Sequence, residues 1–136
     1  MVVAVDSSVL WSIFKEESDA RVWLNFLVAA SSDHALVVCD IVVAELAPYF
    51  PSLEAMKARL ADLDMDFDPI SESTAFSAGL TFREYRRQGG PRQRLLPDFL
   101  IAAHGIYQAN ALAARDLGFM RRYFPNLNLV QPETNS

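Results

Sequence analysis

The sequence predicts a single α/β domain over residues 1–136, with a central parallel sheet of four to five strands flanked by helices. Two features point to this class. Short runs rich in valine and alanine alternate with segments of helical periodicity, and no linker, internal repeat or low-complexity stretch divides the chain. The length is sufficient to bury a hydrophobic core. We place that core within about residues 2–132, followed by a short C-terminal tail.

In the first half of the chain, each apolar run is followed by helical spacing. The first strand stops abruptly at Asp6, Ser18 is a candidate helix cap, and Pro48 ends a helix. The expected strands are 1–5 and 35–39, and the expected helices are 7–17, 19–30, about 41–47 and 52–63.

The second half repeats this alternation. The expected helices are 72–88 and 98–109, and the expected strands are 111–114 and 128–131. Four aromatic side chains at helical spacing are assigned to the core or to a dimer contact: Trp11, Phe14, Trp23 and Phe26.

The segment ADLDMDFDPI (61–70) has the acidic content of a calcium loop but not its pattern. An EF-hand that started at Asp62 would need glycine and glutamate where Phe67 and Ser73 stand. Period-two alternation instead predicts an edge strand that turns Leu63, Met65 and Phe67 to the core and the aspartates to water.

The bulk properties exclude several classes. A net charge of −5 argues against a general nucleic-acid coating protein. The single cysteine, Cys39, rules out an internal disulfide and a four-cysteine zinc site, and it fits a reducing, cytoplasmic location. The run Val2–Val5 is too short for a signal peptide, and no apolar run is long enough for a membrane span, so no membrane association is expected.

Four acidic residues are expected at the carboxyl edge of the sheet. Asp6 follows the first strand, Asp116 follows the fourth, Glu45 lies in the apolar context DIVVAEL, and Asp98 opens the helix before the fourth strand. If the first and fourth strands are neighbours, these side chains gather where open α/β sheets bind ligands. Taken singly, Asp6 and Asp98 could be helix caps and Asp116 could begin a turn.

Clustered carboxylates repel one another unless a cation is present. Their oxygen ligands suit Mg²⁺ or Mn²⁺ better than zinc. Such ions activate water for in-line attack at phosphorus, so the acidic cluster predicts phosphodiester hydrolysis.

Four segments together resemble a known family. VVAVDSSVL, VVAEL, LLPDFLIAAHG and AARDLGFMRRYFP occur in the order and spacing of a PIN domain, and specifically of a VapC-type toxin of a bacterial toxin–antitoxin pair. The resemblance implies an endoribonuclease that cleaves structured RNA with a metal-bound water and depends on Mg²⁺ or Mn²⁺. It places catalytic and metal-binding roles on Asp6, Glu45, Asp98 and Asp116. It also implies a homodimer that a cognate VapB-type antitoxin inhibits.

The sequence departs from the family pattern at Ala114, where related sequences often have a hydroxyl two residues before the last aspartate. A hydroxyl that could orient Asp116 or the metal-bound water is therefore missing at this position. Ser8 could support a metal-bound water, although Ser7 and Ser8 could equally be a helix start. A non-catalytic RNA- or protein-binding module on the same fold remains the alternative.

Basic residues are concentrated near the proposed site. Arg92, Arg94 and Arg115 are the candidates for phosphate contacts with RNA, with a solvated helix face as the alternative. The eight arginines of this group are Arg83, Arg86, Arg87, Arg92, Arg94, Arg115, Arg121 and Arg122. His104 lies six residues after Asp98, on another side of the helix, and is expected to be structural.

Overall fold

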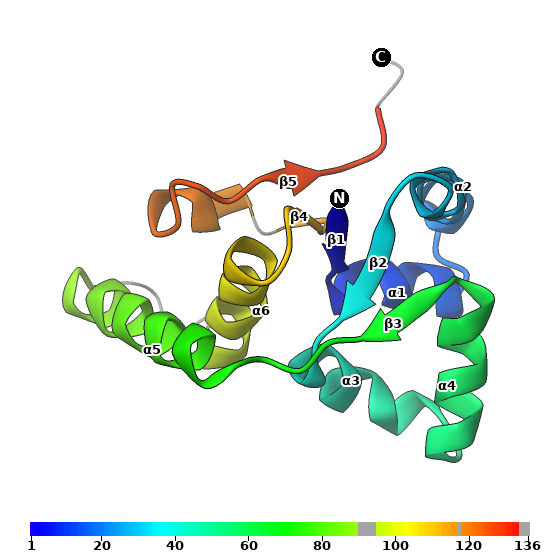
Figure 1. Cartoon of the computed structure of the whole chain (residues 1–136), viewed down its shortest axis with the longest axis horizontal. Coiled ribbons are helices and arrows are strands. Elements are labelled where there is room, and N and C mark those ends of the chain that lie inside the picture. The colour runs from blue at the N-terminus through cyan, green and yellow to red at the C-terminus, as the bar shows by residue number, and fades with distance from the viewer. Residues whose placement is uncertain (90–94, 117, 134–136) are drawn as a thin grey trace.

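The computed structural model describes residues 1–89, 95–116 and 118–133, and these form one α/β fold (Figure 1). The strands are β1 (Val2–Val5), β2 (Ala35–Val38), β3 (Met65–Phe67), β4 (Ala111–Ala113) and β5 (Leu129–Val130). The helices are α1 (Ser7–Phe14), α2 (Ala20–Ser31), α3 (Asp40–Leu46), α4 (Leu53–Asp62), α5 (Glu72–Arg87) and α6 (Leu96–Tyr107). Two short 3₁₀ helices are η1 (Ala47–Tyr49) and η2 (Gly118–Arg122).

The five strands form one parallel sheet in the order β3-β2-β1-β4-β5, which confirms the predicted fold class. The first and fourth strands are neighbours, with Val5 opposite Ala113. The chain therefore winds from β1 toward β3 on one side and toward β5 on the other. A reversal of this kind opens a crevice at the carboxyl ends of the two central strands.

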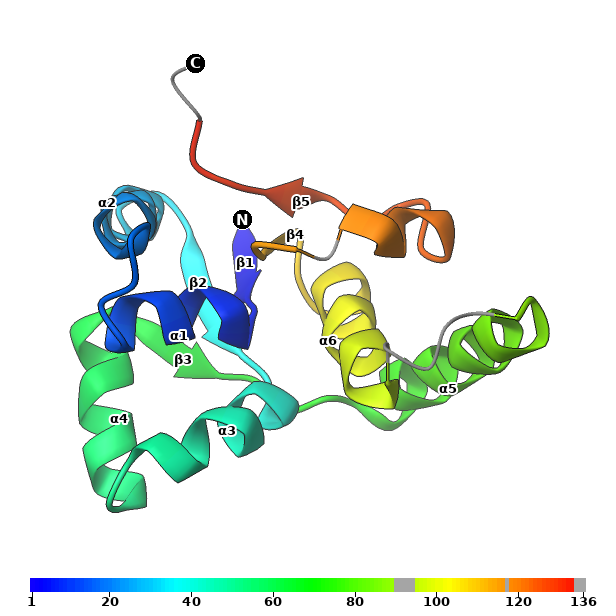
Figure 2. The same cartoon turned by 180° about the vertical axis from the view of Figure 1, so that it is seen from behind.

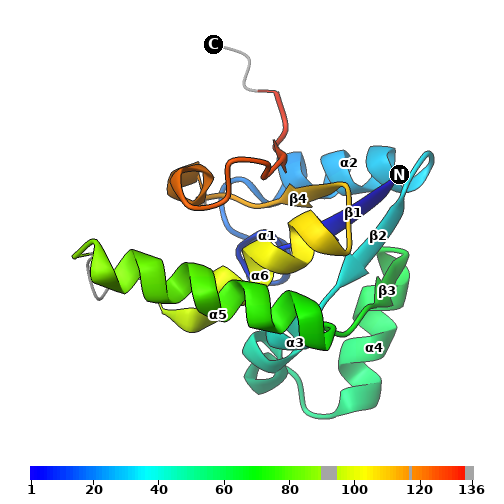
Figure 3. The same cartoon turned by 60° about the vertical axis from the view of Figure 1, so that its left-hand side comes forward.

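Helices cover both faces of the sheet. Figure 3 shows α5 in front, α6 behind it against the central strands, and α1 and α2 on the far side. Residues 3–5 of β1 are 1–2% exposed, because both faces are covered. This double burial explains why β1 is continuously apolar rather than alternating.

Close packing of α6 on β4 depends on a glycine. A Cβ built at Gly105 would lie 2.9 Å from Cβ of Leu112, closer than side chains tolerate. The neighbouring residues Ala102 and Ala103 are small and fully buried. The small side chains let the helix backbone approach the strand, which fixes the position of the α6 N-terminus relative to the end of β4.

Some boundaries differ from the sequence-based expectation. Helix α6 begins at Leu96 rather than at Asp98, because Pro97 fits the first turn of a helix, where no backbone N–H is needed. Helix α1 ends at Phe14 rather than at residue 17. The cap of α2 is Asp19 and not Ser18, and its carboxylate accepts a hydrogen bond from the Ser12 hydroxyl.

The expectation for the acidic edge strand is wrong at two positions. Phe67 is 58% exposed and lies in a groove beside Met56 and Leu60, because β3 is a three-residue edge strand with no further strand beyond it. Asp68 does not simply face water, since its Oδ2 lies 2.9 Å from Nε2 of buried His104. Met65 is buried, as expected.

The aromatic side chains on α1 and α2 contribute to the core. Phe14 and Trp23 are buried, while Trp11 and Phe26 pack against the core from its margin. Among the residues that the structure describes, no helix combines the length and the apolar character that a membrane span requires.

Candidate functional site

Asp6, directly after β1, is a buried acid at the carboxyl edge of the sheet. The backbone of Asp6 still belongs to the sheet, because its N–H donates to the Ala113 carbonyl at 2.9 Å. The same residue is the N-cap of α1, and its Oδ2 accepts from Ser8 N–H at 3.3 Å and from Ser8 Oγ at 2.6 Å. Asp6 is 5% exposed. It is therefore a helix cap and a buried carboxylate at once.

Burial raises the pKa of Asp6 from 3.8 to about 6. The hydrogen bonds from Ser8 oppose that rise, whereas the negative charges of Glu45 and Asp116 add to it. The two acids that act on Asp6 come from α3 and from the segment after β4. Their influence shows that three elements distant in sequence bring carboxylates to the same edge.

Glu45 lies on α3 and is linked to the start of α1. The hydroxyl of Ser7 donates to its Oε1 at 2.9 Å. Burial raises the pKa of Glu45, the Ser7 hydrogen bond lowers it, and the charge of Asp98 raises it. From the sequence, Ser7 was only a possible helix start, and its contact with Glu45 was not predicted. The signal in the sequence was the pair of serines, Ser7 and Ser8, that directly follows Asp6.

Asp98 lies in the first turn of α6. Its Oδ2 accepts a hydrogen bond of 3.3 Å from the backbone N–H of Leu95, the residue before the helix. A carboxylate at a helix N-terminus is favoured by the exposed N–H groups there. Its charge also reaches Glu45 on α3. Asp98 thus accepts a hydrogen bond from the residue before α6 and acts electrostatically on Glu45.

The electrostatic couplings connect all four predicted acids. Asp6 is influenced by Glu45 and Asp116, and Glu45 by Asp98. Figure 2 shows α1, which Asp6 caps, together with α3 and α6, which carry Glu45 and Asp98, near the end of β1. Within the described ranges, however, no three acidic, histidine or cysteine side chains lie close enough together to hold one metal ion. Serine hydroxyls donate to one oxygen each of Asp6 and Glu45.

The chemistry of the donors nevertheless fits a hard divalent cation. All are carboxylates, and the two with raised pKa values, Asp6 and Glu45, are each raised partly by neighbouring negative charge. A cation at this edge would offset both the burial and the repulsion. Asp6, Glu45 and Asp98, with Asp116, are the residues that would hold it.

Ser8 connects the two central strands. Besides its bond to Asp6, its Oγ accepts a hydrogen bond of 3.3 Å from the backbone N–H of Arg115. Arg115 directly follows Ala114, the position at which the family pattern has a hydroxyl. The Ser8 hydroxyl thus joins the buried acid after β1 to the segment that leads to Asp116.

The guanidinium of Arg115 is engaged within the chain. Its Nη1 lies 3.0 Å from Oε2 of Glu17, and its Nε lies 3.1 Å from Oδ2 of Asp19. Nη1 also donates to the Ser8 carbonyl at 3.3 Å. These contacts fasten the α1–α2 connection to the end of β4. The other two arginines singled out for RNA contact, Arg92 and Arg94, lie outside the described residues.

His104 is a structural residue rather than a member of the site. It is 1% exposed, and its imidazole Nε2 lies 2.9 Å from Oδ2 of Asp68. Gln108 also donates to Asp68, at 3.2 Å, and to the Pro69 carbonyl, at 2.9 Å. This cluster fastens the connection before α5 to the C-terminal half of α6.

The fold and the acidic edge define an α/β domain of the kind that binds ligands at the carboxyl ends of its strands. The sequence profile of the PIN domain family matches residues 3–125, and the chain belongs to this family. A search of curated proteins gave no match.

Several solved structures share this fold. The chain is similar to VapBC2 from Rickettsia felis bound to a DNA fragment from its promoter, with 21% identity, a TM-score of 0.70, and coverage of 96% of this chain and 98% of that one. VapBC-1 from nontypeable Haemophilus influenzae has 18% identity and a TM-score of 0.68, and the match covers 96% of this chain and 98% of that one. FitAcB from Neisseria gonorrhoeae has 19% identity and a TM-score of 0.65, and the match covers 96% of this chain and 97% of that one.

Proposed function

We propose that this protein is a metal-dependent endoribonuclease of the VapC type, the toxin of a toxin–antitoxin pair. The observation that carries the proposal is the buried carboxylate of Asp6, held beside two other acids at the carboxyl edge of a PIN domain. A buried charge among like charges is costly to the fold. A bound cation would offset this cost, because its positive charge stabilises the ionised carboxylates.

The residues of the chain have distinct parts in this proposal. Ser8 orients Asp6, Ser7 orients Glu45, and the N-terminus of α6 supports Asp98. Mg²⁺ or Mn²⁺ held by these acids would supply the Lewis acidity that activates water and offsets charge on the phosphoryl group. The acids bind and position, while basic side chains nearby hold the phosphates of RNA.

Protein partners are proposed from the neighbours and from the surface. The similar structures are described as VapBC and FitAcB complexes, which supports a VapB-type antitoxin for this chain. Apolar side chains are exposed over α4 and β3, where Leu53 and Phe67 are each 58% exposed. Exposed apolar surface of this kind is typical of protein interfaces. We propose, from the family resemblance, that the toxin is a homodimer.

The test is cleavage of a mixed pool of structured cellular RNAs by the purified protein, free of antitoxin, with Mn²⁺, with Mg²⁺ and with a chelator. Asp98→Asn should abolish most cutting and keep the fold, because asparagine is also accepted at helix N-termini. The control is Asp33→Asn, an exposed aspartate at the end of α2, which should cut like the parent.

Discrete fragments that disappear with the chelator and with Asp98→Asn would support the proposal. Intact RNA under every condition, from folded protein, would contradict it and favour the non-catalytic binding module. If Asp98→Asn cut as fast as the parent while the chelator still stopped cutting, the role of Asp98 would be wrong and the nuclease would stand.

A further inference from the structure

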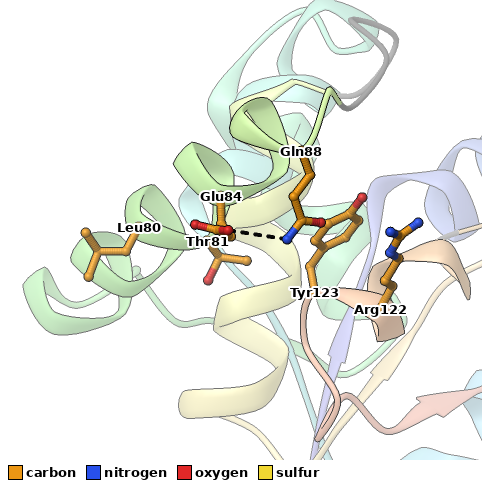
Figure 4. Close-up of a pocket in the computed structure, with 6 residues that line it drawn as sticks. All are labelled: Leu80, Thr81, Glu84, Gln88, Arg122 and Tyr123. Atoms are coloured by element: carbon orange, nitrogen blue, oxygen red, sulfur yellow. Dashed lines mark hydrogen bonds between the residues drawn. The ribbon is translucent and has the colours of Figure 1, made fainter.

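An open pocket lies between α5 and η2, outside the acidic edge. Its volume is about 430 Å³. Figure 4 shows the side chains that line it: Leu80, Thr81 and Glu84 from α5, its C-cap Gln88, Arg122 from η2, and Tyr123 directly after η2. Volumes of this order accommodate small organic ligands. The lining combines an aromatic ring, a cation and three further hydrogen-bonding side chains, those of Thr81, Glu84 and Gln88.

The pocket adjoins the segments that carry two of the acids, Asp98 and Asp116. Helix η2 begins two residues after Asp116. Behind the pocket, the ring of Tyr123 lies 6.1 Å from the ring of Phe99, which follows Asp98 at the start of α6. A polynucleotide held at the acidic edge would therefore pass close to this pocket.

Tyr123 is held firmly by other aromatic rings. Its centroid lies 5.1 Å from that of buried Tyr85, with an interplanar angle of 82°. The guanidinium carbon of Arg122 lies 5.8 Å from the centroid of Tyr123. Proteins recognise unpaired RNA bases by stacking them on aromatic rings or on guanidinium planes. The pair Tyr123 and Arg122 offers both surfaces beside one cavity.

The opposite wall presents hydrogen-bond acceptors. The side-chain amide nitrogen of Gln88 donates to Oε1 of Glu84 at 3.3 Å (Figure 4). The carboxylate of Glu84 and the amide oxygen of Gln88 can both accept hydrogen bonds at this wall of the pocket. Guanine is the RNA base with two adjacent N–H donors on its Watson–Crick edge, and a carboxylate matches such a pair.

The surroundings favour nucleic acid although the pocket contains a carboxylate. Five exposed arginines lie on the two elements that form it: Arg83, Arg86, Arg87, Arg121 and Arg122. Positive charge of this density attracts the phosphate backbone, whereas Glu84 would repel a phosphate inside the pocket. The ligand expected within the pocket is therefore a base and not a phosphate group.

We propose that the pocket between α5 and η2 binds one unpaired guanine of the RNA substrate and so helps to select the cleavage site. The proposal rests on the proposed ribonuclease function. Tyr123 and Arg122 stack the base, and Glu84 with Gln88 reads its Watson–Crick edge.

The first test measures binding without cleavage. Two-dimensional NMR of the isotopically labelled protein is recorded with GMP, AMP, CMP, UMP and inorganic phosphate in turn. GMP should shift the side-chain amide of Gln88 and the backbone amides of Arg122 and Tyr123, with an affinity at least about fivefold above that of the other nucleotides. Glu84→Gln should remove this preference. Glu72→Gln, an exposed glutamate on the same helix, should retain it.

Equal shifts with all four nucleotides, or with phosphate alone, would overturn the proposal, because the pocket would then read only charge or ring surface. The absence of shifts at these residues would overturn it as well. Neither outcome depends on whether the protein cleaves RNA, so the ribonuclease proposal is judged separately.

The second test sequences the fragment ends after cleavage of a random RNA pool. The parent and Glu72→Gln should show guanine at a fixed distance from the cut, and Glu84→Gln should lose that enrichment while its total cutting changes much less. Cleavage with an unchanged guanine preference in Glu84→Gln would contradict the base-reading role but leave the nuclease intact.

Discussion

The hydroxyl of Ser8 lies 2.6 Å from Oδ2 of Asp6 and fixes the orientation of this buried carboxylate. The same hydroxyl accepts a hydrogen bond from Arg115, one residue after the alanine at which the family pattern has a hydroxyl. The Ser8 side chain, in the first turn of α1, thus contacts the segment after β4 that leads to Asp116.

The ionisation of Asp6 should make stability depend on pH. Because burial raises its pKa from 3.8 to about 6, the native protein holds the proton more tightly than the unfolded chain does. The contribution of Asp6 to the free energy of unfolding therefore falls as the pH rises through this window. The total loss is about 3 kcal/mol.

Asp6→Asn should remove that loss, since asparagine also caps helices. In urea unfolding with a chelator present, the variant should gain up to about 3 kcal/mol over the parent above about pH 7 and little near pH 4. Asp33→Asn, at an exposed site, should show no such difference. A gain of the same size at every pH would argue against a buried ionised Asp6.

The approach of α6 to β4 should not tolerate a methyl group. Gly105→Ala would place Cβ against Leu112 and force the helix away from the strand, which should cost about 2 kcal/mol in urea unfolding. RNA cleavage should fall as well, because α6 carries Asp98. Gly79→Ala, where a Cβ meets nothing within 4 Å, should be neutral or stabilise α5 by up to about 1 kcal/mol. Equal stabilities of the two variants would contradict the close packing.

The partner of buried His104 should be needed for stability. Asp68→Ala removes the only acceptor near its Nε2 in the described structure, so the imidazole would be buried with an unsatisfied nitrogen. The expected loss is about 1–3 kcal/mol, measured by urea unfolding at neutral pH. Asp66→Ala, an exposed site in β3 two residues before Asp68, serves as the control. If both substitutions cost the same, the histidine contact contributes nothing.

Arg115 should matter more for the fold than for RNA. Lysine cannot reproduce the contacts with Glu17, Asp19 and the Ser8 carbonyl, because it lacks the forked guanidinium. Since these groups are partly exposed, Arg115→Lys should lower stability by only about 1 kcal/mol. In Arg115→Gln, which removes the charge, RNA affinity and its salt dependence, measured by filter binding, should stay unchanged. A flatter salt dependence in Arg115→Gln would instead show that this residue contacts phosphate, as its sequence context predicts.

The sequence by itself determined the parallel α/β class and the candidate acids. Continuous apolar runs such as VVAV identify strands buried on both faces, and Asp6 and Asp116 stand out because charge follows such a strand directly. The position of Asp98 at a helix start was also evident, since its apolar neighbours have helical spacing. These features are local, so composition and periodicity reveal them.

Only the tertiary structure decided how these residues meet. Contacts such as Ser7 to Glu45, Ser8 to Arg115 and His104 to Asp68 join segments that lie 36 or more positions apart along the chain. The alternating pattern of residues 61–70 also predicted that Phe67 faces the core, but this side chain is exposed. The burial of an edge strand depends on which elements cover it and not on its own pattern. Propensity and period describe one element at a time, whereas the partners of a buried charge depend on which elements the fold packs together.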